Sequence, residues 1–290
     1  HCEFLLRANT SEWAGWYAKN KDKYQMQGNN ASDAYDFSRN EEGILQYWRE
    51  RLETNKDFES ILTLGIRGVH DGAFRCANLS KYEGSTNAEK KVSFMKDVIK
   101  KQRQLIAEVY LDGDMSRIAE VPQVLIPYKE MGTVYNDGLN KFMAQEEYRD
   151  VTLMWAEDNF GYVRQVPTSD EASRSGGTGI YYHSSYWGTP SCYLWLNSTP
   201  LAQLSEELHK AYDAGMRNQW VLNVGDIKPG DQALEFYAKM AWDMESYDDK
   251  TVKENFRIPQ AMRDYHMDQQ TAEEVADCME EYNSIIAVKK

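Results

Sequence analysis

Short apolar runs recur along this chain, and longer segments of mixed character separate them. The runs cover residues 2–8, 60–68, 122–128, 151–157, 179–183 and 219–225. They are almost continuously apolar rather than alternating, which is typical of parallel strands that are buried on both faces. The pattern therefore predicts six strands of one parallel sheet.

The segments between the runs carry apolar residues at helical spacing. The clearest helical patterns cover residues 40–55, 88–112, 200–216 and 231–247. In the second of these, Val92, Met95 and Ile99 fall on one face of a helix. Strands that alternate with helices predict a (β/α) barrel, whose closed form has eight strands. Because the chain begins inside its first run, we expect an α/β fold of the TIM-barrel type that lacks its first two β/α units.

The strand signal stops after about residue 247. Residues 248–290 hold two helical patterns around Pro259. We therefore expect residues 1–247 to form the truncated catalytic barrel and residues 248–290 to begin a C-terminal α-helical domain. A doubly wound open sheet is the alternative fold, but no GxGxxG motif follows any run, which disfavours a nucleotide-binding version.

Charge and composition narrow the classes of partner. The chain has 290 residues and a net charge of −13, which argues against nucleic acid and against an anionic membrane as partners. No apolar run is long enough to span a bilayer. The 19 Tyr and 8 Trp residues favour a carbohydrate ligand weakly, since large rings also fill protein cores. The four cysteines are scattered without a CxxC pair, which excludes a dense disulfide framework and the common zinc ribbon.

Ionisable and amide side chains gather at the ends of the predicted strands. In parallel barrels, the carboxyl ends of the strands form the face where chemistry takes place. The candidates are His1, Arg67, Asp71, Tyr128, Glu130, Asp158, Asn159, His183, Tyr186, Asn223, Asp226 and Lys228. Several carboxylates around one opening suit acid–base chemistry, and Arg67 and Lys228 suit an anionic group of the substrate. The set predicts a glycosidase that acts on an acidic sugar.

Structural interpretations compete with this prediction. Asp71 before Gly72 suits a turn, as does Asp158 before Asn159. Arg67 could join neighbouring loops through a buried ion pair. Glu130 lies where a helix begins, and a carboxylate there complements the helix dipole.

Two other chemistries are weaker alternatives. A metal-dependent hydrolase would draw its ligands from the strand ends, but the spacing of the candidates matches no zinc motif such as HExxH. These candidates are His1, Cys2, Glu3, His70, Asp71, Asp158 and His183. A nucleophilic serine is disfavoured because the chain has no GxSxG motif.

Six stretches resemble the successive signature stretches of glycoside hydrolase family 115, the xylan α-1,2-glucuronidases. They are "HCEFLLRANTSEW", "LGIRGVHDG", "IPYKE", "MWAEDNFGYVRQVP", "GGTGIYYHSSYWGTPSCYLW" and "WVLNVGDIKPGDQALEFYAKMAWD". The resemblance runs in order from residue 1 to about residue 245. It implies a catalytic (β/α)8 barrel between an N-terminal α/β domain and a helical domain.

The resemblance also implies an activity. The expected reaction removes α-1,2-linked glucuronic acid, or its 4-O-methyl ether, from glucuronoxylan or aldouronic oligosaccharides, with inversion and with no cofactor or metal. A secreted or periplasmic location and a homodimer of the full-length protein are implied as well. A non-catalytic glycan-binding barrel is the alternative from a different functional class.

Family roles fall on the matching positions of this sequence. The resemblance implies Glu130 as general acid and Asp71 as general base, with Asp158 in reserve for either role. In an inverting enzyme the two carboxyl groups lie about 6.5–9.5 Å apart. Arg67 and Lys228 would hold the uronate carboxylate, and His183 and Tyr186 would contact sugar hydroxyls or the water. The remaining positions that would line the pocket are Tyr128, Asn159, Asn223, Asp226 and His1.

Two further expectations concern the chain as a whole. Residues 27–43 are polar and look like a variable insertion within the family. A barrel without its first two units exposes two parallel sheet edges, so we expect residues 1–290 alone to be poorly soluble or inactive.

Overall fold

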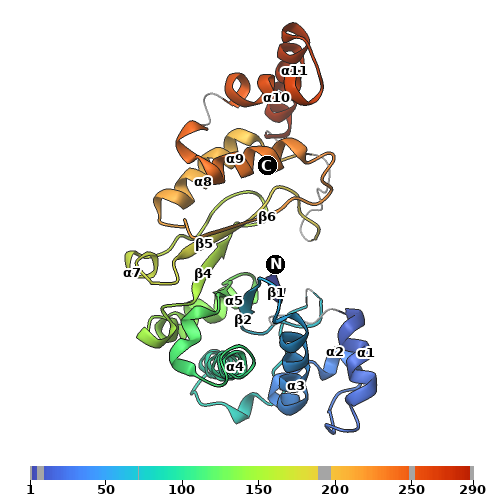
Figure 1. Ribbon diagram of the computed structural model, residues 1–290, viewed down its shortest axis with the longest axis vertical. Helices are drawn as coiled ribbons and strands as arrows, with labels where there is room; N and C mark the ends of the chain where they lie inside the picture. The colour runs from blue at the N-terminus through green and yellow to red at the C-terminus, as the bar shows by residue number, and fades with distance from the viewer. Residues whose placement is uncertain (1, 5–9, 71, 189–196, 248–251, 288–290) are drawn as a thin grey trace. The chain divides into compact units, whose positions relative to one another are not determined.

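The computed structural model describes residues 2–4, 10–70, 72–188, 197–247 and 252–287 (Figure 1). By its internal contacts, the chain divides into two compact units. The first unit comprises His1–Met154 and Ser173–Gly177, and the second comprises Trp155–Ala172 and Thr178–Lys290. The expected domain boundary near residue 247 stays a prediction.

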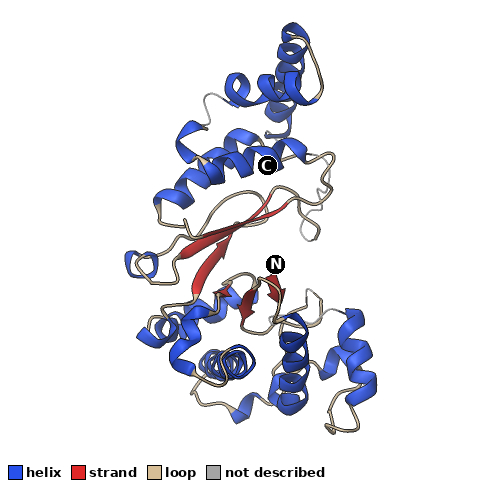
Figure 2. Cartoon of the chain, viewed as in Figure 1, coloured by secondary structure: helices blue, strands red, loops and turns tan. Residues whose placement is uncertain are grey.

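The first unit contains parallel strands in chain order. They are β1 (Cys2–Phe4), β2 (Ile61–Leu64), β3 (Gln123–Leu125) and β4 (Thr152–Ala156), whose last two residues belong to the second unit. Every neighbouring pair among them is parallel, with Leu62 beside Gln123 and Val124 beside Thr152 (Figure 2). Leu64 and Leu125 are fully buried, as expected of strands that are covered on both faces.

Helices cover these strands in the first unit. They are α1 (Thr10–Asn20), α2 (Ala31–Ala34), α3 (Phe37–Asn55), α4 (Asn87–Tyr110), α5 (Glu130–Val134) and α6 (Asn140–Met143). Shorter 3-10 turns cover Leu79–Lys81, Met115–Glu120 and Glu146–Tyr148, and a π-helical turn covers Tyr135–Leu139. Thr86 and Glu89 form a capping box that fixes the start of α4. The predicted apolar face of α4 is buried, which confirms the helical pattern of residues 88–112.

The polar segment 27–43 is part of the packed structure. Asp36 is fully buried, where it accepts hydrogen bonds from Ser38 and from the Ala77 N–H. Asn40 is 5% exposed and bonds the main chain of Gln27 and Ala34. These side chains are polar because they satisfy buried backbone groups. Whether the segment varies within the family stays a prediction.

The second unit continues the strand–helix order. Its strands β5 (Thr178–His183) and β6 (Gln219–Asn223) are parallel, and the end of β4 lies beside β5, where the Glu157 N–H donates to the Tyr181 carbonyl at 3.3 Å. The strands approach closely: a Cβ on Gly179 would lie 2.2 Å from the Gln219 carbonyl oxygen. The helices are α7 (Ser169–Ala172), α8 (Leu201–Asp213) and α9 (Asp231–Trp242), followed by a 3-10 turn at Met244–Ser246.

The described residues from 252 to 287 are mostly helical, as the sequence predicts. A π-helical turn at Val252–Arg257 leads into α10 (Ile258–Asp264) and α11 (Gln269–Ala287). A small cluster of Ile258, Ala261, Ala272 and Ala276 holds α10 and α11 together.

Each predicted run contains a strand, and the clear helical patterns are helices. Parallel strands that alternate with helices are consistent with part of a TIM-type barrel. The two missing β/α units stay a prediction. Among the described residues, we find no helix that combines the length and the apolar character needed to cross a membrane.

Candidate functional site

The loop after β2 carries Arg67 and is fixed by a buried glutamine. Gln102 of α4 is fully buried, and it donates to the Gly65 carbonyl at 2.7 Å while it accepts from the Gly65 N–H at 2.8 Å. Beyond Arg67, the chain turns so tightly that a Cβ on Gly68 would lie 2.5 Å from the Ala73 carbonyl oxygen. The glycine is required there, and the loop that carries Arg67 is therefore held at both ends.

Arg67 forms a two-point contact with Glu130. Its Nε lies 2.9 Å from Oε1 of Glu130, and its second terminal nitrogen lies 3.1 Å from Oε2. The Arg67 side chain is 7% exposed, whereas the Glu130 side chain is 24% exposed. The ion pair that was the structural alternative for Arg67 is therefore present, and its partner is the predicted general acid.

The backbone before Glu130 adopts an unusual conformation. Lys129, the residue that precedes α5, has φ 52° and ψ −130°, a region that favours glycine. This turn follows β3 at once, and it includes a bond from the Tyr128 N–H to the Ile126 carbonyl at 2.9 Å. Tyr128 is half-buried, with the Lys129 ammonium 5.3 Å from its ring centre. The candidates His1 and Asp71 lie outside the described residues.

A second pair of ionisable side chains lies in the second unit, where β4 and β5 end. Glu157 Oε1 bonds Nδ1 of His183, and Glu157 Oε2 accepts from the Gly161 N–H at 3.0 Å. The two side chains are 0% and 4% exposed. The His183 ring also contacts Tyr181 and meets Tyr186 edge-on, with ring centres 4.5 and 5.3 Å away.

Sequence reasoning missed Glu157. A buried carboxylate is costly unless it is paired, and here a histidine and a backbone N–H pair it. The available signal was the run of two acidic residues, Glu157 and Asp158, directly after a buried strand. One of them suffices to form the turn, which leaves the other to point inward.

Asp158 is the member of this pair that forms the turn. Its Oδ1 accepts from the N–H groups of Phe160 and Tyr162 at 3.0 and 3.1 Å, and its Oδ2 accepts from Nε of Arg164 at 2.7 Å. This contact raises the pKa of the Arg164 guanidinium above its usual value. Asn159 has φ 68°, as a residue in a tight turn often does. The hydrogen bonds of Asp158 and the backbone of Asn159 therefore agree with the turn that was the structural alternative.

Asn223, the last residue of β6, contacts the side chains around His183. The Asn223 side chain donates to the Tyr181 hydroxyl at 3.0 Å, so that Asn223, Tyr181 and His183 form a chain of contacts. Asp226 and Lys228 are exposed in the turn that the Gly230 N–H closes on the Asp226 carbonyl at 3.2 Å.

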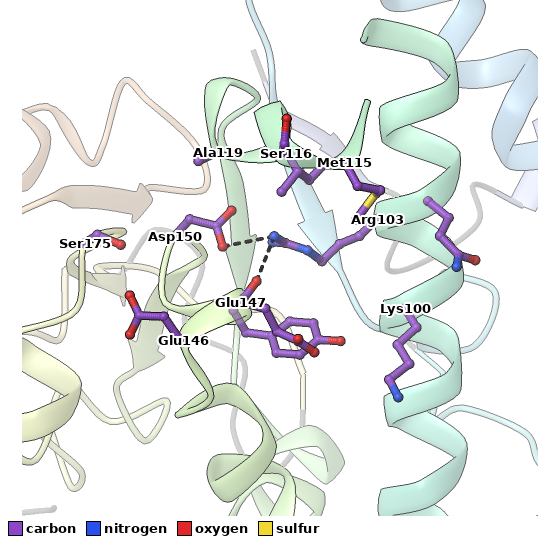
Figure 3. Close-up of a pocket in the computed structure, with 12 residues that line it drawn as sticks. Lys100, Arg103, Met115, Ser116, Ala119, Glu146, Glu147, Asp150 and Ser175 are labelled. Carbon is purple, nitrogen blue, oxygen red and sulfur yellow. Dashed lines mark hydrogen bonds and ion pairs between the residues drawn. The ribbon is translucent and has the colours of Figure 1, made fainter. Parts of the chain in front are cut away.

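A pocket of about 590 Å³ lies in the first unit near the amino-terminal ends of β3 and β4, whereas Arg67 and Glu130 follow the carboxyl-terminal ends of their strands. Arg103 of α4 projects into it and is 2% exposed (Figure 3). Its guanidinium pairs with Asp150 at 3.0 Å and bonds the Glu147 carbonyl at 3.1 Å and the Gln123 side chain at 3.2 Å. Because Gln123 begins β3 and the other two partners come from the segment before β4, Arg103 serves to join α4 to both.

The part of the chain that the structure describes contains no candidate metal site. There, no group of three or more His, Cys, Asp or Glu side chains is placed to hold a metal ion.

Comparisons with known proteins agree with the sequence signatures. The family model described as glycosyl hydrolase family 115 matches residues 1–290. A solved structure described as a family GH115 4-O-methyl-α-glucuronidase with specificity for decorated arabinogalactans is 31% identical, with a TM-score of 0.78. The match covers 98% of this chain and 34% of that one, so this chain spans about a third of that protein's length. No curated protein matches this chain.

Proposed function

Because the chain belongs to glycosyl hydrolase family 115, we propose that it carries active-site residues of a glycoside hydrolase that removes α-1,2-linked glucuronic acid, or its 4-O-methyl ether, from xylan side chains with inversion. Decorated arabinogalactan, which the name of the solved relative mentions, is the second substrate class. The observation that supports the proposal most strongly is the two-point contact between Arg67 and Glu130 at the exits of β2 and β3.

This contact suggests how an acidic sugar would be recognised. The carboxylate of a glucuronic acid residue has the same two-oxygen geometry as Glu130, so it can take the place of Glu130 on the guanidinium of Arg67. Substrate binding would then release Glu130 from Arg67. A sugar without a carboxylate would leave the ion pair intact, so the exchange makes substrate recognition and the freeing of Glu130 one event.

The chemical step follows from the proposed roles. Once Glu130 is released from Arg67, it takes up a proton from solvent, and it gives this proton to the glycosidic oxygen as the bond from that oxygen to the anomeric carbon breaks. A water molecule attacks the anomeric carbon from the opposite face, and Asp71 takes the proton that the water loses. Asp158 remains the reserve for the role of acid or of base. To act in either role, it would have to give up its hydrogen bonds to Phe160, Tyr162 and Arg164.

The other candidates are proposed to bind the sugar. His183, Tyr186 and Asn223 would contact hydroxyls, and Lys228 would assist Arg67 with the carboxylate. Further contacts with the sugar are proposed, on the family resemblance, for Tyr128, Asn159, Asp226 and His1. A secreted or periplasmic location and a homodimer of the full-length protein are proposed on the family resemblance.

The test is the release of glucuronic acid from aldouronic oligosaccharides by the intact protein. We expect release by the parent protein, and its loss in both Glu130→Gln and Asp71→Asn. Proton NMR of the first product should show the β-anomer, since inversion at an α-linkage gives β. Full activity in both variants would refute the assigned roles. Binding without release would support the glycan-binding alternative, and loss of activity on chelation would support the metal-dependent one.

A further inference from the structure

A small pocket in the second unit combines an unpaired cation with an exposed aromatic ring. It lies where the α8–β6 loop meets the end of α9, and its volume is about 280 Å³. Tyr212, Arg217, Asn218, Trp220 and Trp242 line it. Trp242 is 93% exposed, so a face of its large ring is open to a ligand.

Arg217 is held in position by its neighbours. Its guanidinium lies 4.0 Å from the centre of the Tyr212 ring, and its Nε donates to the Tyr212 carbonyl at 3.0 Å. Stacking on the ring and the hydrogen bond both restrict the side chain, so less freedom is lost when a ligand binds its terminal nitrogens.

Arg217 has no acidic neighbour among the described residues that line the pocket. Among the described residues that line the pocket, Arg217 is the only charged one, and within the described part of the chain it forms no ion pair. The chain as a whole has a net charge of −13. Arg103 and Arg67, by contrast, are both paired with carboxylates. A fixed guanidinium without a carboxylate favours an anionic ligand.

We propose that this pocket is a second binding site for an acidic glycan. The guanidinium of Arg217 would take the carboxylate of a uronic acid residue, and the flat face of Trp242 would stack on the sugar ring. The choice of ligand rests on the proposed function, which supplies a polymer with uronic acid side chains. The pocket lies at the start of β6, whereas the candidate residue Asn223 ends that strand, about 13 Å further along. The pocket is therefore separate from Asn223, which is proposed to contact the sugar that is cleaved.

The test is affinity electrophoresis of the intact protein through gels that contain glucuronoxylan. The matched gel contains the same polymer after its carboxyl groups have been reduced to alcohols. All proteins carry Glu130→Gln, so that turnover does not change the polymer. We expect the parent to be retarded more by the acidic polymer, and Arg217→Gln to bind it about tenfold more weakly, as loss of a charge-assisted contact predicts. Trp242→Ala should weaken binding to both polymers.

Two controls separate the site from general effects. Phe58→Ala removes a ring that is 62% exposed in the first unit, and we expect it to leave retardation unchanged. Arg217→Lys keeps the charge but loses the planar fork, so its retardation should lie between those of the parent and Arg217→Gln. Melting temperatures check that each variant is folded.

The outcomes distinguish this proposal from the proposed function. Equal retardation by the two polymers, or unchanged retardation of both Arg217→Gln and Trp242→Ala, would overturn the second site. The latter result is also expected if another part of the protein covers Trp242. Suppose that the protein with Glu130 intact releases no glucuronic acid while the retardation still depends on Arg217. That combination would refute the proposed activity and leave the second site standing.

Discussion

The two units each hold a glutamate at a strand exit, paired with a side chain from the neighbouring strand's exit, but the two glutamates are buried to different extents. Glu130 in the first unit is 24% exposed and contacts only Arg67 through its carboxylate among the described residues. Glu157 in the second unit is 0% exposed and contacts both His183 and the Gly161 backbone. The partly exposed glutamate is accessible for the proposed exchange with a substrate carboxylate, whereas the buried one is suited to hold a histidine in place. Similar pairs on one fold thus support different roles.

Removal of the Glu130 proton donor should have the largest effect. We expect Glu130→Gln to lower kcat/KM for an aldouronic oligosaccharide by about a thousandfold, the size of a general acid's contribution. Glu53→Gln, which changes an exposed glutamate of the same unit, is the control and should retain parental activity. A change of less than tenfold in Glu130→Gln would assign proton transfer to another residue.

Replacement of Glu157 should act on stability. In Glu157→Gln, the contact with His183 loses its charge, and the new NH2 group either faces the Gly161 N–H, donor against donor, or requires His183 to carry its proton on Nε2. We expect the free energy of unfolding to fall by about 2 kcal/mol, measured by urea denaturation of the intact protein. Glu206→Gln, on the exposed face of α8, should leave it unchanged. A neutral result for Glu157→Gln would contradict the assigned role of the buried pair.

The geometry of Arg67 should matter as well as its charge. Arg67→Lys keeps one positive charge but cannot contact two oxygens in parallel. We expect kcat/KM to fall by about tenfold for the acidic oligosaccharide, mainly through a higher KM. Binding of a glucose-decorated analogue, measured by calorimetry, should not change. Equal losses for both ligands would indicate that Arg67 supports the fold rather than the carboxylate.

The Arg164 contact should have the smallest effect. The Arg164 side chain is 69% exposed, and exposed ion pairs contribute little to stability. We therefore expect no measurable shift in melting temperature for Arg164→Gln, at low or at physiological salt. Loss of glucuronic acid release in Asp158→Asn, with full activity in Arg164→Gln, would move Asp158 from the turn into the catalytic role held in reserve.

The apolar runs predicted the strands well, but not where they end. The run at 60–68 continues past β2, which stops at Leu64 because Gly65 takes a left-handed conformation with φ 93° and bonds Gln102. The run at 122–128 exceeds β3 because Tyr128 turns back on Ile126. Both reasons are tertiary or conformational, and hydrophobic periodicity contains neither.

The aromatic content also had a structural explanation. Trp13, Trp48 and Trp155 are at most 1% exposed, and Trp13 stacks on Trp16 with ring centres 5.6 Å apart. These rings belong to the core. The spacing of Trp13 and Trp16 in "SEWAGWYAKN" is a signal for helix α1 that the predicted helical patterns did not include.

The candidate site was predicted in part. The sequence identified Arg67 and Glu130 separately, and it offered an ion pair for Arg67 without naming the partner. It did not identify Glu157, because a residue's burial depends on the strand that packs beside it and not on its own neighbours. The contact between Glu157 and His183 spans 26 positions of the chain, which a single sequence does not reveal.

At Lys129, the backbone conformation that is best for stability differs from the one that orients Glu130. A side chain at φ 52° and ψ −130° carries a conformational strain of about 1–3 kcal/mol, which a glycine would relieve. Selection for heat tolerance alone would therefore be expected to install glycine at this position. The same exchange would loosen the peptide that aims the adjoining carboxylate, so lineages that depend on rapid turnover should resist it. Stability and the orientation of the Glu130 carboxylate would then be traded against each other at a single residue.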